Sequence, residues 1–170
     1  MTDQFRKIVF KLTQDSDGYP PVSFESLWGI QKEEHLYQID NTPYYLYGVS
    51  KGDWVCTQTD ENELIAVSVA KQSGHSTVRV FASCKEDKLA IKENLQRLGA
   101  VCSITSALSL FSVDIPPHVS FTAIDEYLSS ITNDETIAYE DACLQHGTLD
   151  ASRLAECVSL ASLRMKPDAA

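Results

Sequence analysis

Hydrophobic and polar residues alternate along the first 70 positions with the period of two that is typical of β-strands. Within Lys7–Leu12, every second residue is apolar and lies on one face. Further short strands are predicted at Ser26–Gln31, Leu36–Ile39, Tyr44–Tyr47, Trp54–Thr59 and Leu64–Ala70. Clusters of turn-forming residues, such as Asp15–Pro21, separate these segments. Short strands joined by close turns favour a meander that curls into a small barrel or a strongly bent sheet.

After Gly74 the pattern changes to strands that alternate with helices. Thr77–Ala82 is predicted as a strand, and Ser83 with Glu86 matches the capping box that begins many helices. The helix that follows is expected to end at Gly99, because glycine readily adopts the conformation that terminates a helix. Its apolar stripe consists of Ile91, Leu95 and Leu98.

The next segment predicts two strands, a second helix and a last short strand. The strands are expected at Ala100–Thr105 and Leu108–Ile115, and Ser120 is expected to cap the helix. That helix presents the apolar stripe Phe121, Ile124, Leu128 and Ile131. Thr136–Tyr139 is the final strand candidate. The resulting order βαββαβ predicts a ferredoxin-like unit.

A third amphipathic helix is predicted at the end of the chain. Asp150 can cap a helix over Ala151–Met165. Its apolar stripe is Leu154, Cys157, Val158 and Ala161. We expect this helix to dock on its own domain, and a helix that binds a partner or forms a dimer is the alternative. The predicted organisation is therefore α+β, with a β-rich meander or small barrel at 1–73, a ferredoxin-like unit at 74–147 and a C-terminal helix and tail at 148–170, packed as one compact unit.

Length and composition indicate a soluble cytoplasmic protein. With 170 residues and 44% hydrophobic composition, the chain can bury one good core. It contains no apolar run near the ~20 residues that span a bilayer, and its N-terminus lacks the features of a signal peptide. The five cysteines are odd in number and widely spread, so we expect reduced thiols. As a separate expectation, the protein is a monomer or a weak homo-oligomer.

Charge is distributed very unevenly along the chain. The net charge is −10, and the segment 98–152 contains no lysine or arginine. It carries the carboxylates of Asp114, Asp125, Glu126, Asp134, Glu135, Glu140, Asp141 and Asp150. A field of one sign repels nucleic acids and anionic membranes and attracts a basic protein surface. The first seven carboxylates are therefore candidate partner-binding residues, although an acidic surface can also serve solubility alone.

The segment Ser73–Val80 offers the best local candidate for chemistry. His75 next to Ser76 suggests a hydrolase, but a nucleophile elbow would lie between a strand and a helix, whereas this segment enters a strand. The structural interpretation is that Gly74 forms a turn, that the polar side chains satisfy backbone groups, and that Arg79 neutralises a nearby carboxylate. A cleft around His75, Ser76 and Arg79 remains the catalytic or nucleotide-binding alternative.

No complete metal or cofactor motif is present. Cys143 and His146 have half the spacing of a zinc site, but a second pair is missing. The segment Asp15–Gly18 resembles a calcium loop without its glutamate at the required distance, and is better read as a turn. Adjacent acids such as Asp134–Glu135 are more typical of a solvated surface than of an acid–base dyad. We therefore expect no metal, no cofactor and no catalytic residues.

Aromatic residues concentrate in the β-rich half. They are Trp28, Trp54, Tyr44, Tyr45 and Tyr47. We interpret them as core residues with one exposed tyrosine, and an interaction hot spot is the alternative. Phe81 and Phe111 could stack on RNA bases from a ferredoxin-like sheet, but the surrounding charge has the wrong sign, so they are assigned to the core.

Several segments together carry a family resemblance over roughly residues 7–147. They are Asp17–Ser23, Glu25–Trp28, Leu36–Tyr45, Gly48–Asp53, Ser73–Val80 and Val113–Pro117. In these segments the chain resembles an uncharacterised bacterial family of small stand-alone domains. Compact cytosolic proteins of this sort resemble the immunity proteins that accompany secreted bacterial toxins. The resemblance implies no established activity, and apart from Val113–Pro117 its motifs lie outside the acid-only segment 98–152.

The leading hypothesis is a non-enzymatic immunity or inhibitor protein. Its partner would be a cognate toxin that acts on nucleic acids or nucleotides, because such enzymes hold phosphates with basic residues that an acidic face can occlude. Neither nucleic acid nor a membrane is expected as a partner. The alternatives are a small enzyme or nucleotide-binding domain, and a regulatory oligomer joined through its sheet.

Overall fold

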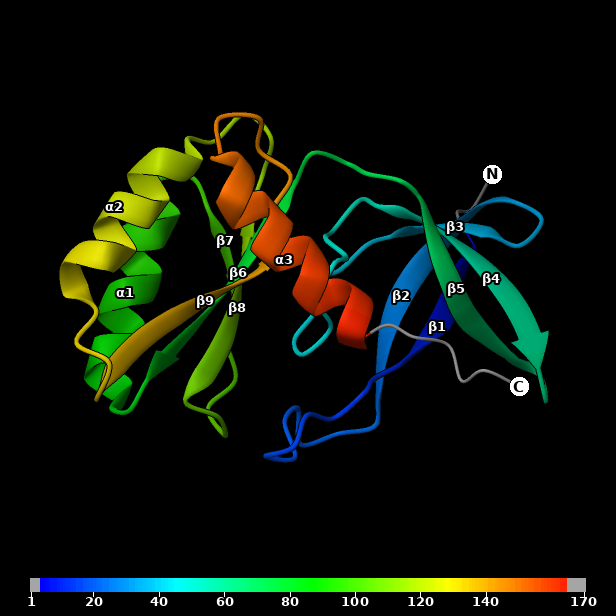
Figure 1. The fold of residues 1–170 in the computed structure, drawn as a ribbon, viewed down its shortest axis with the longest axis horizontal. Helices are drawn as coiled ribbons and strands as arrows, with labels where there is room; N and C mark the ends of the chain where they lie inside the picture. The colour runs from blue at the N-terminus through cyan, green and yellow to red at the C-terminus, as the bar shows by residue number, and fades with distance from the viewer. Residues whose placement is uncertain (1–3, 165–170) are drawn as a thin grey trace.

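The computed structural model describes residues 4–164, and the side chains up to residue 157. Five strands of the N-terminal half form a closed barrel (Figure 1). They are β1 (Phe5–Lys11), β2 (Phe24–Glu33), β3 (Leu36–Ile39), β4 (Trp54–Asp60) and β5 (Glu63–Lys71). Consecutive strands pair antiparallel, and a parallel pairing of β1 with β5 closes the barrel. The small barrel expected from the spacing of short strands is thus present.

The barrel core follows the predicted alternation. Ile8, Leu27 and Val55 are each no more than 1% exposed and belong to one apolar cluster. Gly29 faces the same interior, where a Cβ atom would lie 2.9 Å from Ile8 Cγ1. Only glycine allows the β1 side chain to pack this closely against β2. Trp28, on the opposite face of β2, is 53% exposed, so its assignment to the core was wrong.

The predicted strand Tyr44–Tyr47 is a loop. Its backbone N–H groups point to a side chain instead of a neighbouring strand: the Glu25 carboxylate accepts hydrogen bonds from Tyr44 N, from Tyr45 N at 2.8 Å and from Leu46 N at 2.7 Å. The Tyr44 hydroxyl donates to the carbonyl of Leu110 in the second sheet. This loop therefore connects the barrel to the other half of the molecule.

The second half forms a four-stranded sheet with the order β7-β8-β6-β9. Its elements are β6 (Ser76–Ala82), α1 (Lys85–Arg97), β7 (Val101–Ser103), β8 (Leu110–Ile115), α2 (Phe121–Ile131) and β9 (Ile137–Cys143). All adjacent strands pair antiparallel. β9 is longer than the predicted segment Thr136–Tyr139, because its polar C-terminal part pairs with β6 all the way to Thr77.

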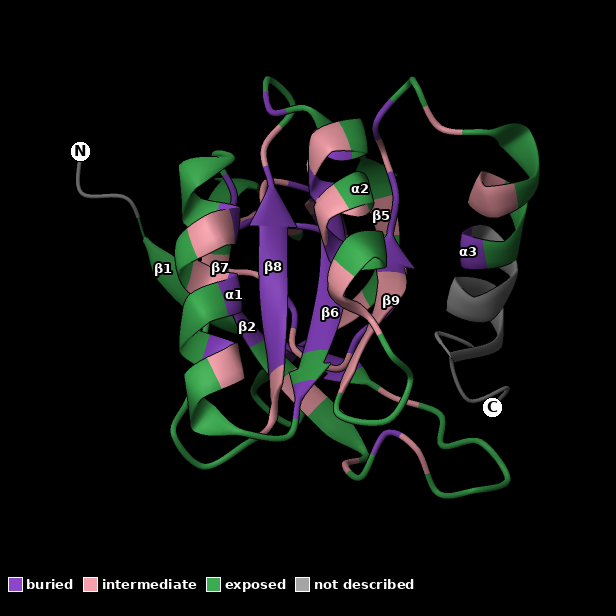
Figure 2. Cartoon of the chain, turned by 90° about the vertical axis from the view of Figure 1, so that its left-hand side faces the viewer, coloured by how far each residue is buried: buried purple, intermediate pink, exposed green. Residues whose placement is uncertain are grey.

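Helices α1 and α2 cover one face of this sheet, as Figure 2 shows, with the central strands β6 and β8 buried behind them. Ser120 caps α2 as predicted and accepts from Ala123 N at 3.2 Å. The cap of α1 was predicted one residue early: Cys84, not Ser83, is the N-cap, and its sulfur accepts from Asp87 N. Gly99 follows the end of α1 with a φ of +101°, the left-handed conformation that favours glycine.

The C-terminal helix α3 (Ala151–Arg164) lies beside β9, at the edge of the second sheet (Figure 2). Cys157 is buried in the core of the second sheet, and Leu154 packs on the same core. Val158 and Ala161 of the predicted stripe lie outside the described side chains, and Met165, the predicted end of the helix, lies outside the described residues. No helix among the described residues is long and apolar enough to cross a membrane.

Candidate functional site at the joint between barrel and sheet

The barrel and the sheet meet through a buried polar network centred on Asp53. This side chain is fully buried and accepts hydrogen bonds from Ser50 N at 2.9 Å and Ser73 N at 2.8 Å, both from the barrel half. The Gln145 side chain, which follows β9, donates to both carboxylate oxygens of Asp53 at 3.1 and 2.9 Å. A buried carboxylate with this many donors is well compensated and fixes the geometry of the joint.

Ser76 and His146 form a close pair inside this joint. Ser76 Oγ lies 2.6 Å from His146 Nδ1 and accepts from the backbone N of Gln145 at 2.8 Å. His146 Nε2 lies 3.1 Å from the carbonyl oxygen of Pro116, an acceptor only, so Nε2 carries the proton and Nδ1 accepts from the serine. The pair resembles a nucleophile with its base, but Ser76 is 0% exposed and its lone pairs are already occupied. Its hydrogen bonds hold the segment after β9 against β6.

The side chains of His75 and Thr77 also form hydrogen bonds within the protein. His75 Nδ1 lies 2.8 Å from Asp114 Oδ1, and Thr77 Oγ1 lies 2.7 Å from the hydroxyl of Ser50. Burial raises the pKa of Asp114, and the hydrogen bond from His75 opposes that shift. The predicted role of these side chains was to satisfy backbone groups, which holds for Ser76, whereas His75 and Thr77 bond to other side chains.

Arg79 is the largest fully buried side chain in the described part of the chain. Its guanidinium carbon lies 4.5 Å from the centre of the Tyr47 ring, and Nη2 donates to the carbonyl of Leu46. Nη1 lies 3.6 Å from Glu140 Oε1, so the prediction that Arg79 neutralises a carboxylate is confirmed. Because Arg79 and His75 line two different hollows and the buried Ser76 lines neither of them, the three do not share a cleft.

Four of the seven predicted partner-binding carboxylates are engaged within the fold. Asp114 is 2% exposed and therefore does not belong to an accessible face. Asp125 and Asp141 both bind Arg153, through hydrogen bonds of 2.7–2.9 Å. Glu140 accepts from the Tyr47 hydroxyl at 2.7 Å and lies against Arg79. These contacts reduce the negative field that the sequence alone predicts.

The other three carboxylates, Glu126, Asp134 and Glu135, are exposed. Asp134 and Glu135 lie in the turn between α2 and β9, where the Asn133 side chain accepts from three backbone N–H groups. A hydrogen bond of 2.9 Å from Ser83 N to Thr136 O joins this turn to the start of α1. We call these three residues the exposed acidic set.

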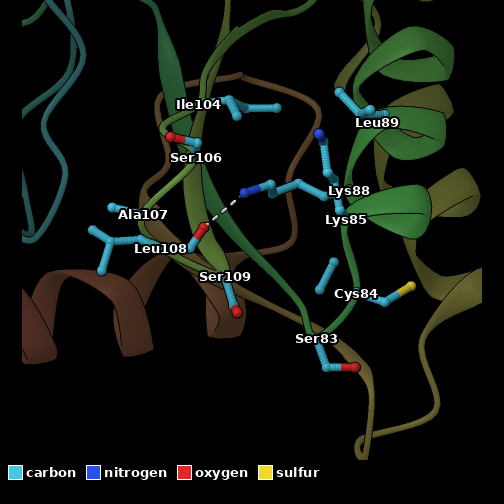
Figure 3. Close-up of a pocket in the computed structure, with 11 residues that line it drawn as sticks. Ser83, Cys84, Lys85, Lys88, Leu89, Ile104, Ser106, Ala107, Leu108 and Ser109 are labelled. Carbon is cyan, nitrogen blue, oxygen red and sulfur yellow. Dashed lines mark hydrogen bonds between the residues drawn. The ribbon is translucent and has the colours of Figure 1, made fainter.

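A hollow of about 450 Å³ lies between α1 and the connection from β7 to β8 (Figure 3). Lys88 extends from α1 toward that connection and donates to the carbonyls of Thr105 and Leu108, both at 2.9 Å. Its ammonium group is therefore occupied in holding the connection in place, and it is not available as a free charge in the hollow. This arrangement indicates a structural role.

The residues of the two partial metal-binding motifs have structural roles. Within residues 4–164, no group of three or more His, Cys, Asp or Glu side chains is placed to hold a metal ion. His146 is committed to Ser76 and Pro116, and burial raises the pKa of the Cys143 thiol to about 12. Asp15 accepts from Asp17 N and Tyr19 N, which is the bonding of a turn.

Several residues at the joint had no signal in the sequence. Asp53, Gln145, Glu25 and Arg153 act through partners between 12 and 92 positions away, which no local pattern reveals. Arg153 offered one hint, since it is the first basic residue after the acid-only segment. A cation in that position is well placed to balance carboxylates that precede it.

In the described residues 4–164, the chain forms two sheets and three helices, and a buried polar network joins its two halves. The chain belongs to the family of the domain of unknown function DUF4265, whose model matches residues 25–139. The crystal structure of a hypothetical protein from Neisseria gonorrhoeae is similar, with a TM-score of 0.69, 17% identity, and coverage of 86% of this chain and 100% of the other. At that identity the likeness shows the fold alone. No curated protein matches the chain significantly.

Proposed function

We propose that this protein is a non-enzymatic immunity or inhibitor protein of the bacterial cytoplasm. Its partner would be a cognate toxin that acts on nucleic acids or nucleotides, and the acidic surface would occlude the toxin's basic active site. The observation that carries the proposal is the exposed acidic set, Glu126, Asp134 and Glu135, in a 55-residue stretch that contains no lysine or arginine. Exposed carboxylates attract a basic surface and accelerate association.

The engaged carboxylates support this proposal in a second way. Arg153 ties Asp141 of β9 to Asp125 of α2, which directly precedes Glu126 on the helix that leads into Asp134. A rigid support lowers the entropic cost of presenting charged side chains to a partner. In this proposal, the ion pairs of Arg153 with Asp125 and Asp141 hold α2 in place, and the exposed acidic set contacts the partner.

The non-enzymatic part of the proposal rests on how the candidate catalytic groups are used. Ser76 and His146 are buried and hydrogen-bonded to backbone as well as to each other. Cys143, whose pKa is raised to about 12 by burial, is a poor nucleophile at neutral pH. These groups contribute to the stability of the joint, which favours a binding protein over an enzyme.

We also assign the second half of the chain to the ferredoxin-like arrangement. The element order β6-α1-β7-β8-α2-β9, the sheet order β7-β8-β6-β9 and the antiparallel pairing of all neighbours support this assignment. In this arrangement the face opposite α1 and α2 is free to receive a second unit. Here the loops of the barrel occupy it, as the bond from Tyr44 to Leu110 illustrates.

The proposal is tested by capturing the partner protein and then measuring its inhibition with purified components. Partners are cross-linked in the native host, and each is purified and assayed for cleavage of DNA or RNA and for consumption of nucleotides. A basic partner whose activity is blocked by one equivalent of this protein is the expected result. The variant Glu126→Gln/Asp134→Asn/Glu135→Gln should inhibit at least tenfold less well at equal concentration.

A matched control removes the same charge from the barrel. Glu33, Glu34 and Asp60 are also exposed, and Glu33→Gln/Glu34→Gln/Asp60→Asn should inhibit like the unmodified protein. A partner that keeps its full activity in the complex would contradict the proposal. Equal inhibition by both triple variants would contradict the role of the exposed acidic set.

A further inference from the structure

The face of the second sheet that lies opposite α1 and α2 contains buried polar atoms that make no hydrogen bond. Val78 and Val80 of β6 point into the core beneath the helices, so Arg79 and Phe81 point to the other side. Among the described residues, Arg79 Nε and Nη1 and Ser112 Oγ are buried and make no hydrogen bond. Arg79 and Ser112 are directly paired across β6 and β8, so these atoms lie together. Buried N–H groups without acceptors are costly, which points to a missing occupant.

A cavity opens beside Arg79 on this face. Its volume is about 340 Å³, and its lining includes Arg79 and Glu140 as well as the apolar side chains of Phe81, Leu110 and Ala138. Phe81 is paired with both Leu110 and Ala138 across the sheet, so these three form one continuous apolar surface beyond Arg79. The cavity thus joins a polar inner end to an apolar outer part. That combination is typical of small-molecule sites.

The polar end offers a donor and an acceptor next to each other. Arg79 supplies unpartnered N–H groups, and Glu140 Oε1 is held by the hydroxyls of Tyr47 at 2.7 Å and Tyr19 at 3.4 Å. Within the described residues, Glu140 Oε2 makes no hydrogen bond. A carboxamide is complementary to this pair, because its carbonyl oxygen accepts and its N–H donates side by side.

The charge of the pair selects against an anion. Arg79 and Glu140 balance each other with 3.6 Å between Nη1 and Oε1. A carboxylate that approached Arg79 would meet the negative charge of Glu140, whereas a neutral amide brings no charge. A flat ring attached to the amide would cover Phe81, Leu110 and Ala138.

We propose that this cavity binds a small, flat, uncharged molecule that carries an amide or lactam group. The carbonyl oxygen accepts from Arg79, the amide N–H donates to Glu140 Oε2, and the ring lies on the apolar surface. This site is independent of the exposed acidic set and of the proposed toxin partner. A cavity of this size accommodates a single ring with one substituent.

The test uses benzamide, benzoate and ethylbenzene as probes of the full-length protein in an amide NMR titration. Benzamide should bind with a Kd of about 1–10 mM, as fragments of this size do, and should shift the amide signals of Phe81, Leu110 and Ala138. Benzoate and ethylbenzene should bind at least tenfold more weakly. No saturable shift with benzamide would mean that the cavity holds only water, and tighter binding of benzoate would overturn the amide assignment.

Two variants separate the site from unspecific binding. Ala138→Trp fills the cavity without altering Arg79 and should abolish the benzamide shifts, whereas Ala70→Trp, at an exposed position on β5, should leave them unchanged. Glu140→Gln removes the competing charge and should improve benzoate binding at least tenfold. Benzamide binding that survives Ala138→Trp, or benzoate binding unchanged by Glu140→Gln, would contradict the proposed site.

Discussion

Arg153, in the first turn of α3, donates two hydrogen bonds to the carboxylate of Asp125 in α2, at 2.8 and 2.9 Å. Both side chains are about three-quarters buried, so water screens the pair only in part. Arg153 also binds Asp141 of β9, which makes one guanidinium the link between three elements. The C-terminal helix is therefore held by charge as well as by the burial of Cys157.

Arg153→Gln should destabilise the protein by about 1–2 kcal/mol, because charge-assisted hydrogen bonds that are partly buried contribute on that order. The two acids left without a cation add to this cost. The free energy of unfolding in urea measures the effect. Arg97→Gln provides the control, because Arg97 pairs with Glu93 on an exposed helix face and should change stability by less than about 0.5 kcal/mol.

The contact between Arg153 and Asp125 also predicts that the stability of the protein depends on pH. The hydrogen bonds from Arg153 hold the pKa of Asp125 below its usual range. A carboxyl group with a lowered folded-state pKa contributes stability that is present above its unfolded pKa, near 4, and that is lost as the pH falls through the folded value. The stability difference between the native protein and Asp125→Asn should therefore be full at pH 6–7 and shrink below about pH 4. A difference that stayed constant to pH 2.5 would contradict this assignment.

Ser76→Ala should cost about 1–3 kcal/mol, because it leaves His146 Nδ1 and the N–H of Gln145 buried without a partner. Thermal unfolding would show the loss. Ser26→Ala, on the exposed face of β2, is the matched control and should melt like the native protein. If the Ser76→Ala protein is stable yet loses inhibition of its partner, Ser76 has a functional role that the buried geometry does not suggest.

The sequence predicted the elements that follow regular periodicity and missed those that depend on long-range contacts. β3 was placed at its observed bounds and Ser120 at its observed cap, because alternation and capping are local properties. Tyr44–Tyr47 has the composition of a strand, but its backbone N–H groups donate to the carboxylate of Glu25, about twenty positions away in the sequence. Local composition cannot reveal such a partner.

In the candidate site, too, the sequence predicted some features and missed those that depend on long-range contacts. Arg79 was correctly expected to face a carboxylate, since an arginine between two apolar strand residues must find a counter-charge. The acid-only segment was visible from charge alone, but burial of Asp114 and the pairing of Asp141 with Arg153 arise only when distant elements pack. Sequence therefore indicates where charge lies along the chain, and tertiary structure decides how much of it remains available.

The most direct test of the central claim is the rate at which the captured partner associates, measured by stopped-flow fluorescence over a range of salt concentrations. For the native protein, the rate should fall steeply as salt rises, since exposed charges are screened over a Debye length of about 10 Å at 0.1 M. Glu126→Gln/Asp134→Asn/Glu135→Gln should associate more slowly at low salt with a flatter dependence, while its melting temperature stays close to native. The account would be contradicted if that variant matched the native protein in both rate and salt dependence.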